Sequence, residues 1–144
     1  MKKSSNKQQG FTLIEILVVM VILGMLAALV VPNIIGRDDD AKVTIAKADL
    51  RNLSNTLSLY KLDNFVYPST EQGLEALVTK PSGEPEAKNW KEGGYLSKLP
   101  KDPWGNVYQY VSPGAHGPFD IYTLGADNKE GGEGYNKDIG NWEL

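Results

Sequence analysis

The feature that most constrains this chain is an apolar run near its start that carries a carboxylate. The run extends from Phe11 to Ile35, and Glu15 lies close to its beginning. A helix of about 20 residues spans the roughly 30 Å hydrocarbon core of a bilayer, so this run is long enough to cross one. Because a charge in hydrocarbon is costly, Glu15 needs a partner or a purpose.

The charges on either side of the run differ in sign. Lys2, Lys3 and Lys7 precede it, whereas residues 38–40 are all Asp. Cytoplasmic flanks of membrane segments carry an excess of Lys and Arg. We therefore expect a single-pass topology with the N-terminus in the cytoplasm and the chain after residue 35 exported.

Three interpretations of the run differ in how they treat Glu15. An ordinary signal anchor gives the carboxylate no role. A secretory signal cleaved in the small-residue stretch 27–29 would have a charge inside its apolar region. In the third interpretation, a peptidase cuts between Gly10 and Phe11, and the new amine lies about 6 Å of helix rise from Glu15. The carboxylate would neutralise that amine, or that of a neighbouring chain, and would set the register of assembly.

The stretch "GFTLIEILVVMVILGMLAALVVPN" closely resembles the class III signal of type IV pilins and type II secretion pseudopilins. That family has a short basic leader ending in Gly, then Phe, with Glu at the fifth mature position; here these are Gly10, Phe11 and Glu15. The resemblance implies cleavage after Gly10 and N-methylation of Phe11 by a prepilin peptidase. It divides the chain into a leader (1–10), a transmembrane and assembly helix (11–35) and a periplasmic globular domain (36–144).

A second apolar pattern follows the run. Its residues recur at spacings of three and four: Val43, Ala46, Leu50, Leu53, Leu57 and Tyr60. This spacing predicts an apolar stripe on a helix. We expect one long helix over about 12–62, kinked at Pro32, whose second half packs on a compact domain.

The remainder of the chain predicts short elements and one long loop. Ser69 and Gln72 have the spacing of a capping box before a short helix. Residues 80–105 form a Pro- and Gly-rich loop, and 106–111 and 119–124 alternate like half-buried strands. The turn between them contains His116, which we expect to be solvated. The expected fold is α+β and pilin-like: a long N-terminal helix, transmembrane in its first half and amphipathic in its second, packed on a small antiparallel sheet with a Gly-rich C-terminal loop.

Four further segments extend the resemblance over essentially the whole chain. They are "YKLDN", "YPSTEQGLEALV", "GGYLSKLPKDPWGN" and "DIGNW", and they look like those of the major pseudopilins, the G-subunit family of type II secretion. The chain has no cysteine, which agrees, because type IV pilins usually close their C-terminal region with a disulfide.

The C-terminal stretch 124–142 is dense in oxygen donors and glycine. Such a loop suits calcium, which accepts six to eight oxygen ligands at irregular angles. It is not an EF-hand, because Lys129 stands where that loop needs an oxygen ligand. On the residues alone, a solvated acidic turn is the favoured explanation over a calcium site, and only the family resemblance reverses this order. Resemblance to the G-subunit family implies one calcium ion, held by the side chains of Asp127 and Asp138 and the carbonyls of Leu124 and Lys129. The roles of Glu133 and Asn136 stay open.

These observations predict a structural subunit of a periplasmic pseudopilus that assembles helically after processing and helps to drive folded proteins across the outer membrane. Alternatives are a type IV pilin for adhesion or motility, or a membrane-anchored periplasmic binding domain. One histidine and no cysteine give no sign of catalysis, and the net charge of −3 gives no pull toward nucleic acid. The resemblance implies as partners further copies of the chain, minor pseudopilins, the prepilin peptidase, and the inner-membrane assembly platform with its ATPase.

Overall fold

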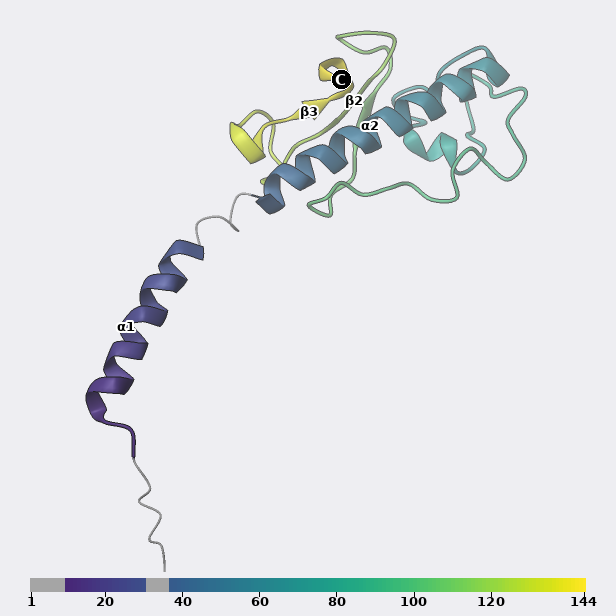
Figure 1. Ribbon diagram of the computed structural model, residues 1–144. Helices are drawn as coiled ribbons and strands as arrows, with labels where there is room; N and C mark the ends of the chain where they lie inside the picture. The colour runs from purple at the N-terminus through teal and green to yellow at the C-terminus, as the bar shows by residue number, and fades with distance from the viewer. Residues whose placement is uncertain (1–9, 31–36) are drawn as a thin grey trace, which may run out of the picture. The chain divides into compact units, whose positions relative to one another are not determined.

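The computed structural model describes residues 10–30 and 37–144, which divide after Asp38 into two compact units. Its elements are α1 (Leu13–Val30), α2 (Arg37–Asn64), η2 (Leu74–Leu77), β1 (Gln109–Val111), β2 (Asp120–Thr123), η3 (Gly134–Asn136), β3 (Ile139–Gly140) and η4 (Asn141–Glu143) (Figure 1). The helix expected over 12–62 corresponds to α1 and α2. The expected kink at Pro32 lies outside the described residues.

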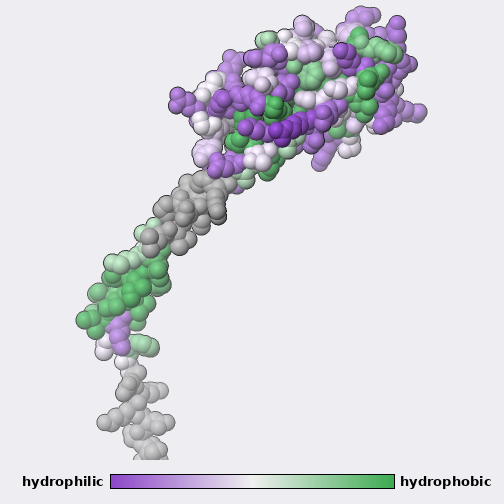
Figure 2. Space-filling model, turned by 45° about the horizontal axis from the view of Figure 1, so that its top comes forward, coloured by the Kyte–Doolittle hydropathy of each residue, from purple (hydrophilic) through white to green (hydrophobic). Residues whose placement is uncertain are grey.

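Apart from Glu15 in its first turn, helix α1 has apolar or small residues on every side. The face of it that Figure 2 shows is mostly green, with purple atoms at its start. Its described large apolar side chains are between 49% and 84% exposed. A helix that is apolar on every side needs a cover of protein or lipid. Among the described residues, no helix combines the length and the hydropathy required to cross a membrane. The membrane segment expected over 11–35 includes residues 31–35, outside the described ranges, and stays a prediction.

Helix α2 supplies one side of the hydrophobic core. Ala46, Leu50, Leu57 and Tyr60 are completely buried, and Leu53 is 1% exposed. These are five of the six residues of the predicted stripe, and the sixth, Val43, is partly buried against them, so the stripe is confirmed. Full burial of one leucine side chain stabilises a fold by about 2 kcal/mol, so this face holds the helix on the domain.

The sheet lies against α2 and has the order β1-β2-β3, with both pairs antiparallel (Figure 1). Tyr110 pairs with Ile121, and Thr123 pairs with Ile139. These four side chains are buried and belong to the surface that meets the helix. The two expected strands are present but shorter than predicted. Strand β3 was not predicted, because two residues carry no readable alternation.

The short helix after Ser69 forms as a 3-10 turn, η2. The Gln72 N–H donates to Ser69 Oγ at 3.2 Å, and the Ser69 N–H donates to Gln72 Oε1 at 3.0 Å. The two reciprocal bonds of the predicted capping box are therefore confirmed, but they close the turn that precedes η2, whose own N-cap is Gly73 and has no side-chain cap. The loop that follows is held by its aromatic residues, since Trp90 Nε1 donates to the Ala76 carbonyl at 2.9 Å and the Tyr95 hydroxyl donates to Asp63 at 3.0 Å.

Candidate functional site

The peptide bond expected to be cleaved lies in the open. Gly10 is exposed, and Phe11 is 85% exposed, just before α1 begins. A Cβ built on Gly10 would meet nothing within 4 Å. The fold therefore does not require glycine at this position, which favours an external requirement such as recognition by a peptidase.

Glu15 has a partner inside its own chain. Its Oε2 accepts hydrogen bonds from the Thr12 N–H at 2.8 Å and the Thr12 hydroxyl at 3.0 Å. The Glu15 N–H in turn approaches Thr12 Oγ1 at 3.4 Å. This is a capping box at the start of α1. Thr12 was not among the predicted site residues, although the T-x-x-E spacing before an apolar run is the signature that would have found it.

The C-terminal loop between β2 and β3 contains residues with positive φ, in the left-handed region of backbone conformation. Asn128 has a φ of 53°, and Gly125 has a φ of 69°. A Cβ at Gly125 would lie 2.8 Å from the Tyr135 carbonyl oxygen, so this close approach requires glycine. Asp127 Oδ1 accepts the Lys129 N–H at 3.2 Å, which closes a turn at the exposed side of the loop.

Asp138 closes the other side of the loop. Its Oδ2 accepts the Gly131 N–H at 3.0 Å, and its own N–H donates to the Gly131 carbonyl at 3.3 Å. Its Oδ1 is buried without any hydrogen-bond partner. A buried carboxylate oxygen without a donor is costly, and a hard cation is a ligand that would satisfy it.

Hydrogen bonds within the C-terminal loop hold three of the predicted calcium ligands. Asp127 and Lys129 are joined in one turn, and Asp138 is bonded to Gly131. Across 10–30 and 37–144, no three histidine or acidic side chains converge closely enough to hold a metal ion. Because the expected site uses two carboxylates and backbone carbonyls, the set of Leu124, Asp127, Lys129 and Asp138 stays a prediction, as do Glu133 and Asn136.

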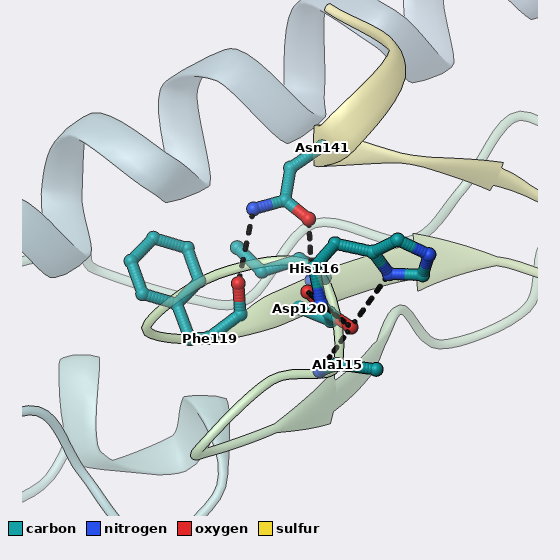
Figure 3. Close-up of polar contacts among 6 residues, drawn as sticks. Ala115, His116, Phe119, Asp120 and Asn141 are labelled. Carbon is teal, nitrogen blue, oxygen red and sulfur yellow. Dashed lines mark hydrogen bonds and ion pairs between the residues drawn. The ribbon is translucent and has the colours of Figure 1, made fainter.

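The last residues dock on the β1–β2 turn through Trp142, which stacks on His116, and through Asn141, whose bonds Figure 3 shows beside the His116–Asp120 contact. The His116 ring stacks on Trp142 at 4.1 Å between centroids and 16° between planes, and its Nδ1–H donates to Asp120 Oδ2 at 2.9 Å. Asn141 fastens the same segment, because its Oδ1 accepts the Ile121 N–H and its Nδ2 donates to the Phe119 carbonyl. His116 is thus half exposed but bound, which corrects the expectation of a solvated ring.

The described geometry defines a pilin-like class of protein: an uncovered apolar helix with a capped glutamate, together with an α+β domain closed by a C-terminal loop. Comparisons with known proteins agree. The family model for type II secretion system (T2SS) protein G matches residues 33–142, and the model for the prokaryotic N-terminal methylation motif matches residues 5–31.

Individual relatives are similar over nearly their full length. The type II secretion system core protein G of Pseudomonas aeruginosa is 65% identical over 138 residues, covering 96% of this chain and 97% of that protein. The core protein G of Vibrio cholerae is 59% identical over 142 residues, covering 99% and 97%. The crystal structure of the major pseudopilin of enterohaemorrhagic Escherichia coli superposes with a TM-score of 0.70 at 47% identity, covering 80% of this chain and 98% of that one.

The chain belongs to the type II secretion system protein G family. Together with the methylation motif, this makes it a membrane-anchored pseudopilin subunit with a periplasmic part. The expected fold class is confirmed by the same structural match.

Proposed function

We propose that this chain is the structural subunit of the pseudopilus fibre and that it becomes competent to assemble when a prepilin peptidase cleaves after Gly10 and methylates Phe11. The observation that carries the proposal is α1, an apolar helix that the described residues of its own chain leave 49–84% exposed. In the membrane, lipid covers such a helix; in a fibre, the helices of neighbouring subunits replace the lipid. A head-to-tail contact that does not close gives a filament, which can help to drive folded proteins across the outer membrane.

The capping box adds a second step to the proposed role of Glu15. Before cleavage, the carboxylate is held by Thr12 at the helix N-terminus. Cleavage creates an amine at Phe11, next to Thr12 in the chain. An amine bears a full charge, so it competes strongly with neutral donors for the carboxylate in a low-dielectric environment. Glu15 then pairs with its own amine or with that of the adjacent subunit.

The proposed topology follows from the flanking charges. The leader lysines remain in the cytoplasm, the segment 11–35 crosses the inner membrane once, and the domain 36–144 is periplasmic. The proposed partners are the prepilin peptidase, further copies of this chain, the minor pseudopilins, and the assembly platform with its ATPase. The role is structural rather than catalytic.

We further propose that the C-terminal loop binds one calcium ion. The unpaired, buried Oδ1 of Asp138 supports this, and so does the glycine-rich backbone around it. Asp138 and Asp127 would supply carboxylate oxygens, with carbonyl oxygens from Leu124 and Lys129. The ion would supply charge neutralisation and would tie β2 to β3, in a chain that has no cysteine for a disulfide.

The decisive experiment is an intact-mass and N-terminal sequence measurement on the mature protein extracted from membranes. We expect a chain that begins at N-methylated Phe11. A chain that still begins at Met1, or one cut near Ala28, would leave Glu15 without its amine and would refute assembly by this route. A Gly10→Ala variant is the matched control, because the structure leaves room for its methyl group and any loss of processing is then due to recognition.

A further inference from the structure

The C-terminal end of α2 carries an apolar protrusion that the described fold leaves uncovered. Leu62 is 72% exposed, Phe65 is 77% exposed, and Leu59, three residues before Leu62, is 44% exposed. Residues three apart lie on the same face of a helix. We call Leu59, Leu62 and Phe65 the apolar knob. Large apolar side chains that are close together in the chain (59–65) and left in water indicate an interaction site.

Phe65 has a backbone conformation that suits a different residue. It directly follows α2, has a φ of 66°, and its N–H donates to the Lys61 carbonyl at 2.7 Å. This left-handed position after a helix is usually occupied by glycine or asparagine, and it is unfavourable for a bulky side chain. Phe65 therefore strains the backbone and also exposes its ring, so neither property stabilises the domain. A role in binding accounts for both.

A cleft on the same compact unit has complementary chemistry. It has a volume of about 200 Å³ and lies between η2, the segment 99–100 and the start of β1. Its apolar lining includes Leu74, Leu99, Pro100 and Val107. Val107 is 63% exposed. The cleft thus offers an apolar floor that is open to solvent and shares no residue with the apolar knob.

Opposite charges flank the two surfaces. Lys61, next to Leu62 on α2, is exposed and extends over the Tyr67 ring, with its Nζ 4.7 Å from the ring centroid. Glu75 is exposed and lines the cleft. Its Oε2 stands above Gly73, where a Cβ would lie only 2.6 Å away. A cation beside the knob and a carboxylate in the cleft give the pair electrostatic complementarity.

We propose that the apolar knob of one subunit docks into the cleft of a second copy of this chain, with Lys61 facing Glu75. Because the knob and the cleft are different surfaces, the contact is head-to-tail, and each subunit at an end of the array keeps a free knob or a free cleft. Such a contact propagates along a fibre. The inference rests on the proposed fibre function and adds a specific contact between globular domains to the packing of the N-terminal helices.

Cysteine cross-linking tests this contact without interference, because the chain has no native cysteine. The full-length Ser58→Cys/Val107→Cys double variant leaves all three residues of the apolar knob in place, because Ser58 is exposed and lies four residues before Leu62 on α2. It is expressed in cells that assemble the fibre and treated with a short bis-maleimide. This reagent tolerates a wider separation than a disulfide does. A head-to-tail contact gives a ladder of dimers, trimers and longer multimers, whereas each single variant gives no ladder. A Ser58→Cys/Ser82→Cys pair, exposed at both positions, controls for random collision.

Charge reversal tests the pairing of Lys61 with Glu75. Lys61→Glu in the cross-linking background is expected to lower the ladder yield about fivefold, equivalent to about 1 kcal/mol. Adding Glu75→Lys is expected to restore it, which a general loss of folding would not do. Fibres that form normally without a Ser58–Val107 ladder, or an equal ladder from the Ser82 control, would overturn the docking inference and leave the fibre function intact. If the unmodified chain forms no fibres, the proposed function itself fails, and the inference with it.

Discussion

Replacing Asp138 by asparagine should change stability in opposite directions with and without calcium. The Oδ1 of Asp138 is buried without a partner, while Oδ2 accepts the Gly131 N–H. The side chain of Asp138→Asn can keep the bond to Gly131 through its amide oxygen. Its neutral amide nitrogen then takes the buried position of the charged Oδ1, also without a partner but at a lower cost than a charged oxygen. In chelator, the wild-type chain bears the cost of an unpaired buried carboxylate oxygen, about 1–3 kcal/mol. Because Asp138 as a whole is only half buried, the lower end of this range of costs applies. The variant should therefore be more stable than the wild-type chain in chelator by about 1 kcal/mol.

In calcium, the wild-type chain should be more stable than the Asp138→Asn variant. A ligand that binds only the folded state at 100 times its Kd stabilises the fold by about 2.7 kcal/mol. For a domain of this size, that raises the Tm by roughly 10–20 °C. The Asp138→Asn variant should lose most of this increase. It should therefore melt several degrees above the wild type in chelator and well below it in calcium.

The assay is thermal unfolding of the full chain in detergent, followed by tryptophan fluorescence. All three tryptophans lie in the unit 39–144, and Trp142 belongs to the C-terminal segment that packs on His116. Glu130→Gln is the matched control, because it removes one charge from an exposed position of the same loop. An Asp138→Asn variant that loses equal stability in both buffers would refute the assignment of a cation to the unpaired oxygen.

Three further predictions concern the core, alkaline pH and assembly. Leu57→Ala should lower the free energy of unfolding, measured in urea, by about 2–5 kcal/mol, because Leu57 is fully buried. The control Leu59→Ala, at a position 44% exposed, should lower it by less than about 1 kcal/mol. Equal losses in the two variants would contradict the assigned buried face of α2. Burial raises the pKa of Tyr110 to about 12. The stability that the buried neutral Tyr110 contributes is therefore complete below about pH 10 and declines as the pH rises toward 12. Urea titrations over pH 8–12 should show this decline in the free energy of unfolding, and a smaller decline in Tyr110→Phe. Glu15→Ala should leave processing and the domain's Tm unchanged but abolish fibres seen by electron microscopy; normal fibres would disprove the register role of Glu15.

Local patterns in the sequence were sufficient for the elements that depend on neighbouring residues. The spacing from Val43 to Tyr60 predicted the buried face of α2, because helical periodicity alone decides which side chains share a side. The Ser69–Gln72 capping box was predicted for the same reason, since both partners lie within one turn. The Thr12–Glu15 box has the same local signature and was equally readable.

Contacts between distant segments could not be read in this way. Strand β3 exists because the glycine-rich loop returns Ile139 to pair with Thr123, and two residues alone carry no strand signal. His116 looked solvated because its stacking partner, Trp142, is far along the chain. Similarly, the composition of the loop predicted oxygen ligands, but only the fold could single out the unpaired Oδ1 of Asp138.

The sequence by itself determined the apolar N-terminal segment with its Gly10, Phe11 and Glu15, the amphipathic stripe of α2, and membership of the pilin-like class. Each of these depends on residue type and on spacings within a few turns of helix. The tertiary structure alone decided how the C-terminal segment packs on β2 and where Lys61, Phe65 and Glu75 lie on the surface. These features depend on packing between segments that are distant in the chain. Such long-range contacts produce no periodic pattern of residues in the sequence.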